Sequence, residues 1–413
     1  MVESNGGKPL RFYRFRPSPF DSTVALNDPW LDPRTAYVHV PFCAHHCGYC
    51  DFAVTAGQDH LIELYLEAVG AELAGLREPR PVESLFIGGG TPTHLSADQL
   101  RRLIETVTRW LPPGRGAGRE FSIEANPDSL TEEKTAVMAA LGVNRVSVGV
   151  QSFRPESLAA LDRRHAPEHI GRAVDAVRKH IPVVSFDLIF GAPGSTIEGW
   201  RADLDAALAF DPQHVSTYGL TYEKGTPLWK RQTRGLVEAV PEDTELAMYE
   251  HAMDRLAAAG FEHYEISNFA RPGYRCRHNE RYWANDAYYG FGVGAARYVN
   301  GSRELNVRDT KLYIRKALGG EDVTFQRETL EPRARAFETL ATQLRRADGI
   351  DRVPFRAQTG FDLDALAPVA LALFRDHGIV TDDGHRVRLT RRGKCVADAA
   401  VAELLKESDG LVD

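Results

Sequence analysis

The sequence predicts an α/β protein: six β/α units form a parallel sheet, either open or closed into a partial (β/α)6 TIM-type barrel, and a C-terminal mainly helical, winged-helix-like domain follows. Two observations predict this fold. Strand-type runs alternate with helix-type runs six times before about residue 240, and such a series forms a parallel sheet covered by helices. From residue 310 onward, helical patterns dominate instead.

The predicted strands are short apolar runs at regular spacing. The first, AYVHVPF at 36–42, is followed by apolar residues at helical spacing over 61–76. The second, SLFIGGGT at 84–91, precedes a helix whose expected N-cap is Ser96. Four further strands, each followed by a segment that can be helical, are predicted at 120–127, 145–152, 184–193 and 214–223.

This pattern divides the chain into an N-terminal extension (1–34), a barrel core (35–240), a linking region (241–310) and a C-terminal domain (311–413). The linking region opens with TELAMYEHAMDRLAAAG, which predicts a long amphipathic helix. In the C-terminal domain, GIVTDDGHRVRLT predicts a strand, a turn and a strand. We interpret that unit as a packing cap for the barrel and not as a DNA-binding module, because the chain is acidic.

Composition indicates a cytoplasmic globular protein. Of 413 residues, 43% are hydrophobic and 26% are charged, and no apolar run predicts a signal peptide or a transmembrane segment. The five cysteines, three of them clustered, fit a reducing compartment in which thiols bind metal. The net charge of −7 argues against a general affinity for nucleic acid.

The clustered cysteines lie in PFCAHHCGYCDF, residues 41–52, hereafter the cysteine loop. Three thiolates on one flexible loop can each bind one iron of a cubane iron–sulfur cluster, which leaves the fourth iron open for a chelating ligand. The alternative is a structural zinc site whose fourth ligand is a histidine of the loop or of the strand before it. The candidate histidines are His39, His45 and His46.

Polar residues follow several predicted strands. Glu124, Gln151 and Asp187 stand at or near strand ends, as does GGGT at 88–91. In a parallel β/α fold, the carboxyl ends of the strands converge on one face, and that face carries the active site. These residues therefore predict a shared ligand site, although each could instead cap the helix that follows it. A phosphate loop is disfavoured because GGGT lacks the Lys-Ser/Thr ending.

With these motifs the sequence resembles the radical S-adenosylmethionine (SAM) superfamily, whose members carry a three-cysteine loop after the first strand. The resemblance implies that Cys43, Cys47 and Cys50 hold a [4Fe-4S] cluster, that an electron donor serves it, and that SAM binds its open iron. It implies reductive cleavage of SAM to a 5′-deoxyadenosyl radical. The residues that it implies as SAM contacts are Tyr37, Tyr49, Gly89, Gly90, Thr91, Glu124, Gln151, Arg163 and Asp187.

Within the superfamily, the sequence resembles the branch that contains oxygen-independent coproporphyrinogen III oxidase and its haem-chaperone relatives. The oxidases carry a further cysteine two positions after the third, where this chain has Phe52. The haem chaperones carry a His-Asn-x-x-Tyr-Trp motif, which here is HNERYW at 278–283. Both features favour the haem-chaperone branch.

The HNERYW motif has a physical interpretation of its own. His278 can supply an axial imidazole to haem iron, and Tyr282 and Trp283 offer flat faces to a porphyrin. The resemblance adds Asn279 to this set, and a histidine near aromatic residues can equally be an ordinary core residue. Cys276 could be a second ligand. Three nearby arginines could pair with the propionates: Arg275, Arg277 and Arg281.

The resemblance therefore implies a protein that binds haem and passes it to a haem-accepting protein. One alternative is an oxidase that decarboxylates a porphyrinogen propionate in porphyrin biosynthesis, and another is a radical enzyme with an unrelated substrate. Phe52 and HNERYW distinguish the first possibility from the second. Whether the chain catalyses a reaction at all stays open at this point.

Overall fold

The computed structural model describes residues 29–114, 118–408 and 410. Most of the predicted N-terminal extension, residues 1–28, lies outside this part of the chain. Two hydrophobic cores organise the remainder: one runs from Ala36 to Val323 and the other from Ala336 to Leu404. We call residues 332–408 the C-terminal unit.

The first core is built on a nine-stranded sheet of order β11-β1-β4-β5-β6-β7-β8-β10-β9. Six of its strands are parallel neighbours in chain order, as the six predicted β/α units require. They are β1 (Thr35–Val40), β4 (Ser84–Gly89), β5 (Glu120–Ala125), β6 (Arg145–Gln151), β7 (Val183–Phe190) and β8 (His214–Gly219). The predicted fold class, a partial (β/α)6 barrel, is confirmed.

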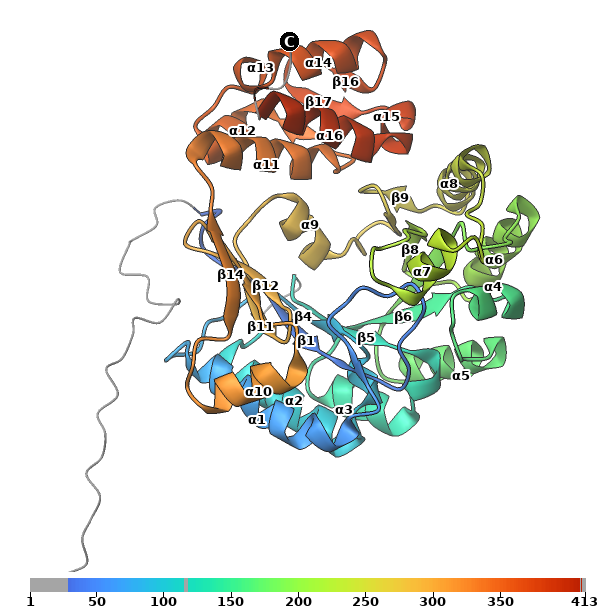
Figure 1. The fold of residues 1–413 in the computed structure, drawn as a ribbon, viewed down its shortest axis with the longest axis vertical. Helices are drawn as coiled ribbons and strands as arrows, with labels where there is room; N and C mark the ends of the chain where they lie inside the picture. The colour runs from blue at the N-terminus through green and yellow to red at the C-terminus, as the bar shows by residue number, and fades with distance from the viewer. Residues whose placement is uncertain (1–28, 115–117, 409, 411–413) are drawn as a thin grey trace, which may run out of the picture.

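Helices cover the outer face of this sheet (Figure 1). They are α1 (Ile62–Ala74), α2 (Ala97–Trp110), α3 (Glu132–Ala140), α4 (Pro155–Ala160), α5 (Pro167–Arg178), α6 (Ile197–Ala209) and α8 (Glu242–Ala258). The short helix α7 (Pro227–Thr233) instead lies against the cysteine loop. Ser96 caps α2 as predicted: its hydroxyl accepts from the Gln99 backbone N–H, and the Gln99 side chain accepts from the Ser96 N–H.

Side chains alternate between the two faces of the six parallel strands, apart from a register shift near the end of β6. The outward positions, such as Val38, Ile87 and Val148, are apolar and fully buried against the helices. The inward positions are mostly small or polar, and they include Ser84, Ser122, Ser147, Ser185 and Ser216. Barrel interiors are normally filled by bulky branched side chains. This interior is instead left partly hollow.

The predicted linking region adds three further strands to the main sheet. They are β9 (Glu262–His263) and β10 (Asn268–Ala270) at one edge and β11 (Tyr289–Gly292), which pairs with β1 in parallel, at the other. A short helix, α9 (Arg277–Trp283), carries the HNERYW motif between β10 and β11. A second sheet of three antiparallel strands follows: β12 (Ala296–Val299), β13 (Ser302–Asn306) and β14 (Thr324–Thr329). Helix α10 (Thr310–Leu318) packs on α1.

The C-terminal unit contains α11 (Pro332–Leu344), α12 (Arg352–Thr359), α13 (Leu363–Leu366), α14 (Pro368–Asp376), α15 (Arg391–Cys395) and α16 (Ala397–Ser408). Its small sheet has the order β15 (Ile350–Asp351), β17 (Arg386–Leu389), β16 (Val380–Asp382). The predicted strand, turn and strand correspond to β16 and β17. In Figure 1, α9 lies between the main sheet and this unit, and it contacts both β4 and α11.

Across the described ranges, no helix combines the length and apolar character that crossing a membrane requires.

Candidate functional site

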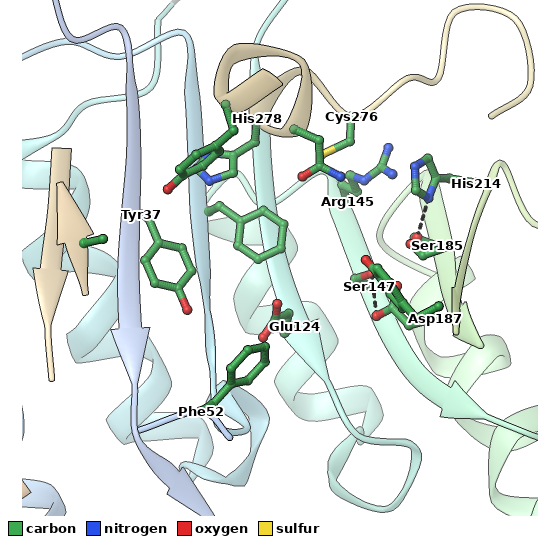
Figure 2. A pocket seen from close by; sticks show the side chains of 16 residues that line it. Tyr37, Phe52, Glu124, Arg145, Ser147, Ser185, Asp187, His214, Cys276 and His278 are labelled. Carbon is green, nitrogen blue, oxygen red and sulfur yellow. Dashed lines mark hydrogen bonds between the residues drawn. The ribbon is translucent and has the colours of Figure 1, made fainter. Parts of the chain in front are cut away.

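The inward side chains of the barrel enclose a cavity of about 320 Å³, which we call the interior cavity. Figure 2 shows its two ends: Glu124 and Phe52 lie toward the carboxyl ends of the strands, and His278, Cys276, Arg145 and His214 lie toward their amino ends. Its other lining residues are Tyr37, Phe86, Ser147, Ser185, Asp187, Ser216, Tyr218, Asn279, Tyr282 and Ala296. One cavity therefore joins residues from the predicted SAM site to residues from the HNERYW motif.

At the carboxyl end, the cysteine loop is fixed by the segments around it. The backbone N–H of Leu228 donates to the carbonyl oxygen of Gly48 at 2.8 Å. Sγ of Cys43 lies 3.6 Å from Oγ1 of Thr91, and Nη1 of Arg163 lies 3.6 Å from Sγ of Cys47. Residues predicted from separate motifs, Thr91 and Arg163, thus meet two of the three thiols.

Glycine is needed at each of the three glycine positions of GGGT, because a different neighbouring residue leaves no room there for a side chain. A Cβ on Gly88 would lie 2.7 Å from Cδ of Glu124. A Cβ on Gly89, whose φ is +109°, would meet the His39 ring at 2.5 Å, and one on Gly90 would lie 2.9 Å from Sγ of Cys43. Side chains at these positions would displace the acid, the imidazole or the thiol. The glycines thus let the β4 end lie directly against the cysteine loop and Glu124.

Two partly buried acids face the interior cavity. The backbone N–H of Gly89 donates to Oε2 of Glu124 at 2.7 Å, and burial raises the pKa of Glu124 to about 8. Ser147 Oγ donates to Asp187 at 3.0 Å, and burial raises the pKa of Asp187 in spite of hydrogen bonds from Ser216 and Ser147. Asp187 is the fifth of eight residues in β7. It therefore lies deeper in the barrel than the strand end at which the sequence analysis placed it.

The remaining predicted SAM contacts surround the same end. Gln151 ends β6 after a register shift and has a φ of +64°, which is uncommon for a residue other than glycine. Arg163 Nη2 donates to the carbonyl oxygen of Gly149 at 2.6 Å. Tyr49 packs against a small apolar cluster that includes Leu161. The Tyr37 hydroxyl lies 3.0 Å from Nδ1 of His39.

The cysteine loop supplies three thiols, the number that a cluster with one open iron requires, although no group of three His, Cys, Asp or Glu side chains among the described residues is already arranged as a metal site. Burial raises the pKa of Cys43 and of Cys50 to about 11, so metal binding there must release protons. Two of the histidines considered as a fourth zinc ligand are already engaged. Nδ1 of His39 faces Tyr37 and its Nε2 lies 3.0 Å from the Ala53 carbonyl oxygen, while Nε2 of His46 lies 3.1 Å from the Cys50 carbonyl oxygen.

At the amino end of the strands, α9 closes the interior cavity. Both carboxylate oxygens of Glu120, the first residue of β5, accept from the start of this helix. The Arg277 N–H donates at 3.0 Å, the His278 N–H at 3.1 Å and the Cys276 thiol at 3.4 Å. Glu120 thus holds the amino end of α9 against the barrel.

The His278 imidazole is buried among aromatic rings. Its ring centroid lies 5.0 Å from that of Phe86 and 4.8 Å from that of Tyr282. Nδ1 lies 2.9 Å from Oγ1 of Thr35, and burial lowers the pKa of His278 to about 3. The ring is therefore neutral near pH 7. Its Nε2 has no hydrogen-bond partner among the described residues.

The other members of the motif separate into two groups. Asn279 and Tyr282 line the interior cavity, whereas Trp283 lies outside it, with the Arg345 guanidinium 5.0 Å from its ring centroid. The arginines considered for propionates include two that are already paired. Arg275 pairs with Glu262 and Asp348, and Arg281 pairs with Glu83 and Asp286.

Sequence reasoning missed the polar residues at the amino ends of the strands. The cavity-lining members of this set are Arg145, Ser147, Ser185, His214 and Ser216. The sequence does carry a pattern that could have predicted these residues. In RVSVGVQ and in HVSTYG, the first residue and every second residue after it are polar or small. In a parallel strand, such alternation marks a second face that does not pack against helices.

Comparison with protein families gives two matches. Residues 37–207 match the Radical SAM superfamily, and residues 330–396 match the HemN C-terminal domain. The first range contains the cysteine loop and all the predicted SAM contacts. The second range falls almost wholly within the C-terminal unit.

Curated relatives match nearly the whole chain. The heme chaperone HemW of Bacillus subtilis is 35% identical and aligns with 91% of this chain and 100% of its own. The heme chaperone HemW of Mycobacterium tuberculosis is 36% identical over 90% of this chain and 95% of its own. That of Escherichia coli is 32% identical over 91% and 99%.

Among solved structures, coproporphyrinogen III oxidase (HemN) from Escherichia coli, a radical SAM enzyme, is similar with a TM-score of 0.79. The likeness covers 91% of this chain and 90% of that one at 22% sequence identity. Identity at this level shows a shared fold.

Proposed function

Since this chain belongs to the heme chaperone HemW family within the radical SAM superfamily, we propose that it binds haem and passes it to an acceptor protein. The observation that carries this proposal is the state of His278. Its imidazole is neutral, Nδ1 contacts Thr35, and Nε2 remains available to a metal. A neutral imidazole whose other nitrogen is held by a hydrogen bond is the usual form of a histidine ligand.

The cysteine loop would hold a [4Fe-4S] cluster through Cys43, Cys47 and Cys50. The cluster would supply an open iron for the amino and carboxylate groups of SAM and, with an electron donor, reducing power. This chain's own residues would orient SAM. Partly buried Glu124 and Asp187 face the interior cavity as acceptors for hydroxyl groups, and Arg163 provides a guanidinium beside Cys47.

The haem and SAM proposals involve opposite ends of one cavity. Thr35 and Glu120, which hold α9, are the first residues of their strands, whereas Gly89 and Glu124 stand at or next to the ends of theirs. The cluster end could therefore influence haem at the α9 end through residues that line the cavity between them. We propose that the cluster and SAM regulate or support haem transfer in this way.

An oxidase function is less well supported. Phe52 stands where the oxidases carry a further cysteine, and its side chain lines the interior cavity while being 63% exposed. The HemN likeness concerns the fold alone at 22% identity.

The test is haem binding by the full chain after anaerobic cluster reconstitution, followed by an assay for conversion of coproporphyrinogen III with SAM and reductant. We expect stoichiometric haem binding and no conversion. His278→Ala should lower haem affinity or shift the Soret band, whereas the exposed His180→Ala should change neither. Catalytic formation of protoporphyrinogen would overturn the chaperone proposal. If His278→Ala binds haem with wild-type affinity and an unchanged spectrum, the axial ligand of the haem iron is a residue other than His278.

A further inference from the structure

Arg145 is the first residue of β6, and its side chain points into the interior cavity (Figure 2). Only 4% of its surface is exposed to solvent. Its Nη1 donates to the carbonyl oxygen of Tyr274 at 3.0 Å, and no carboxylate of the described residues lies close enough to form an ion pair with it. A permanently charged guanidinium is thus buried with one protein hydrogen-bond partner.

Burying a charge without a partner is costly, so buried guanidinium groups are normally paired. Arg297 is a matched example in the same chain, since it is 3% exposed. It pairs with Glu304 and with Glu72 at 3.4 Å, and it also donates to Asn306. Arg145 is as deeply buried as Arg297, but no carboxylate of the described residues forms an ion pair with it.

The two acids that act on Arg145 through space have other partners. Glu120 accepts from the Arg277 and His278 N–H groups, and Asp187 accepts from Ser147. These acids offset part of the charge on Arg145 without occupying its N–H groups. The unfilled donors belong to a residue that lines the interior cavity, so a group in that cavity can reach them.

The cavity wall beside Arg145 supplies further polar groups. The hydroxyls of Ser147, Ser185 and Ser216 and the amide of Asn279 line it. Ser185 Oγ lies 2.8 Å from Nδ1 of His214, whose Nε2 lies 2.8 Å from the Tyr264 hydroxyl, which fixes the imidazole in one orientation. The small serine side chains leave room for a ligand. Ser147 and Ser216 already donate to Asp187, so the groups that can donate to an anion are Ser185 and Asn279. The volume of about 320 Å³ limits that ligand to a small group.

We propose that Arg145 is the anchor of a carboxylate-binding site inside the barrel, with the Ser185 hydroxyl and the Asn279 amide completing the donor set. The planar fork of a guanidinium matches a carboxylate through two parallel hydrogen bonds. A carboxylate could come from a haem propionate or from a separate small organic acid. The first source rests on the proposed function, because His278 and Arg145 line the same cavity. The second source does not.

The sequence had suggested Arg275, Arg277 and Arg281 for the propionates. Since Arg275 and Arg281 are already ion-paired, binding a propionate there would require breaking existing pairs. Arg145 requires no such exchange.

The test compares wild type with Arg145→Gln, which removes the charge, and Arg145→Lys, which keeps the charge but loses the fork. Arg255→Gln, which removes an ion pair with Asp205 on the surface of α8, is the control. The probes are sodium propionate, followed by ligand-observed NMR at constant ionic strength, and haem against haem dimethyl ester, followed by absorption titration. Circular dichroism and iron content verify that each variant is folded.

We expect wild type and Arg255→Gln to bind propionate, with roughly tenfold weaker binding in Arg145→Gln and an intermediate loss in Arg145→Lys. Tighter binding of haem than of its ester in wild type, lost in Arg145→Gln, identifies the propionate as the source. Propionate binding that depends on Arg145, with equal affinity for haem and its ester, identifies a separate acid. That second result supports the site even if the chain binds no haem.

The proposal is overturned if wild type binds propionate no better than Arg145→Gln and also fails to discriminate haem from its ester. Should Arg145→Gln not fold, the guanidinium NMR resonances of wild type give the same answer. Propionate should shift the Arg145 resonance and leave that of the half-exposed Arg255 unchanged. An Arg145 resonance that propionate does not shift would equally overturn the proposal.

Discussion

Oγ1 of Thr35 lies 2.9 Å from Nδ1 of His278, which joins the first residue of the first barrel strand to the first residue of the HNERYW motif. Burial lowers the pKa of His278 to about 3, so the ring is neutral at physiological pH and exists as one of two tautomers. Because the Thr35 hydroxyl can donate to the Ser84 carbonyl oxygen at 3.3 Å, it can accept from Nδ1–H, and that arrangement selects the tautomer whose Nε2 carries the lone pair. That is the form required to bind iron.

Thr35→Val should therefore weaken haem binding without removing the ligand itself. Loss of one hydrogen bond costs about 1 kcal/mol, which corresponds to roughly a fivefold higher dissociation constant. An absorption titration measures this change, and the Soret maximum reports on ligation. Thr233→Val, an exposed substitution in α7, is the control and should leave both unchanged. If Thr35→Val has wild-type affinity and spectrum, the contact has no part in haem ligation.

The cysteine loop predicts the iron content. After anaerobic reconstitution, the chain should hold about four irons and four sulfides. Cys43→Ala, Cys47→Ala and Cys50→Ala should each abolish the visible absorption of the cluster. Cys395→Ala should not, because that thiol lies in α15 and donates to the Arg391 carbonyl oxygen. Stoichiometric zinc with no cluster after reconstitution would contradict this assignment.

SAM should bind only when the cluster is present, because the open iron is its main anchor. Asp187→Ala and Gln151→Ala should weaken SAM binding while leaving the iron content unchanged, since the side chains that form hydrogen bonds with the loop thiols are instead Thr91 and Arg163. Isothermal titration of cluster-loaded and cluster-free protein measures both effects. Equal SAM affinity with and without the cluster would show that these side chains serve another ligand.

Glu124 predicts a pH dependence of stability in the cluster-free protein. Burial, opposed by the Gly89 N–H, raises the pKa of Glu124 to about 8, whereas a glutamate in an unfolded chain ionises near pH ~4.3. Between these values the folded state holds a proton that the unfolded state has released. The contribution of Glu124 to stability therefore falls as the pH rises through this window and levels off above about pH 8.

Glu124→Gln cannot ionise, so its melting temperature relative to wild type should increase from about pH 6.5 to pH 8 and then remain constant. Scanning calorimetry across this range measures the difference. The buried histidines do not confound it, because wild type and Glu124→Gln contain the same histidines and their contribution to the pH dependence cancels in the difference. Burial lowers the pKa of His39 and His165 to about 4 and that of His278 to about 3, so in the folded state they are neutral in this range. A difference independent of pH would show that Glu124 is already ionised in the folded protein.

The six parallel strands could be predicted from the sequence because each is a local apolar run with a helix after it. The Ser96 cap and the β16–β17 pair were predictable for the same reason. Strand β11 was not, because YGFG has only four residues and pairs with a strand about 250 positions earlier in the chain. Its place in the sheet depends on packing between distant segments.

The candidate site divides in the same way. The three cysteines, the glycines of GGGT and the HNERYW motif could be identified from residue type and spacing alone, since one short segment carries each of them. The sequence could not show that Trp283 lies outside the interior cavity and that Asp187 lies below the strand end. Both facts depend on which face and which level of the barrel a side chain occupies.

By itself, then, the sequence determined the β/α alternation, the cysteine loop and the branch of the superfamily, because these reside in contiguous residues. Only the tertiary structure decided that His278 and Glu124 share one cavity at opposite ends of the strands, and that Arg145 is buried in that cavity with no carboxylate partner in the described part of the chain. The physical reason is that a cavity and an unpaired charge are properties of what surrounds a residue. Those surroundings come from β5, β6 and α9, which are far apart in the chain and meet only when the barrel closes around them.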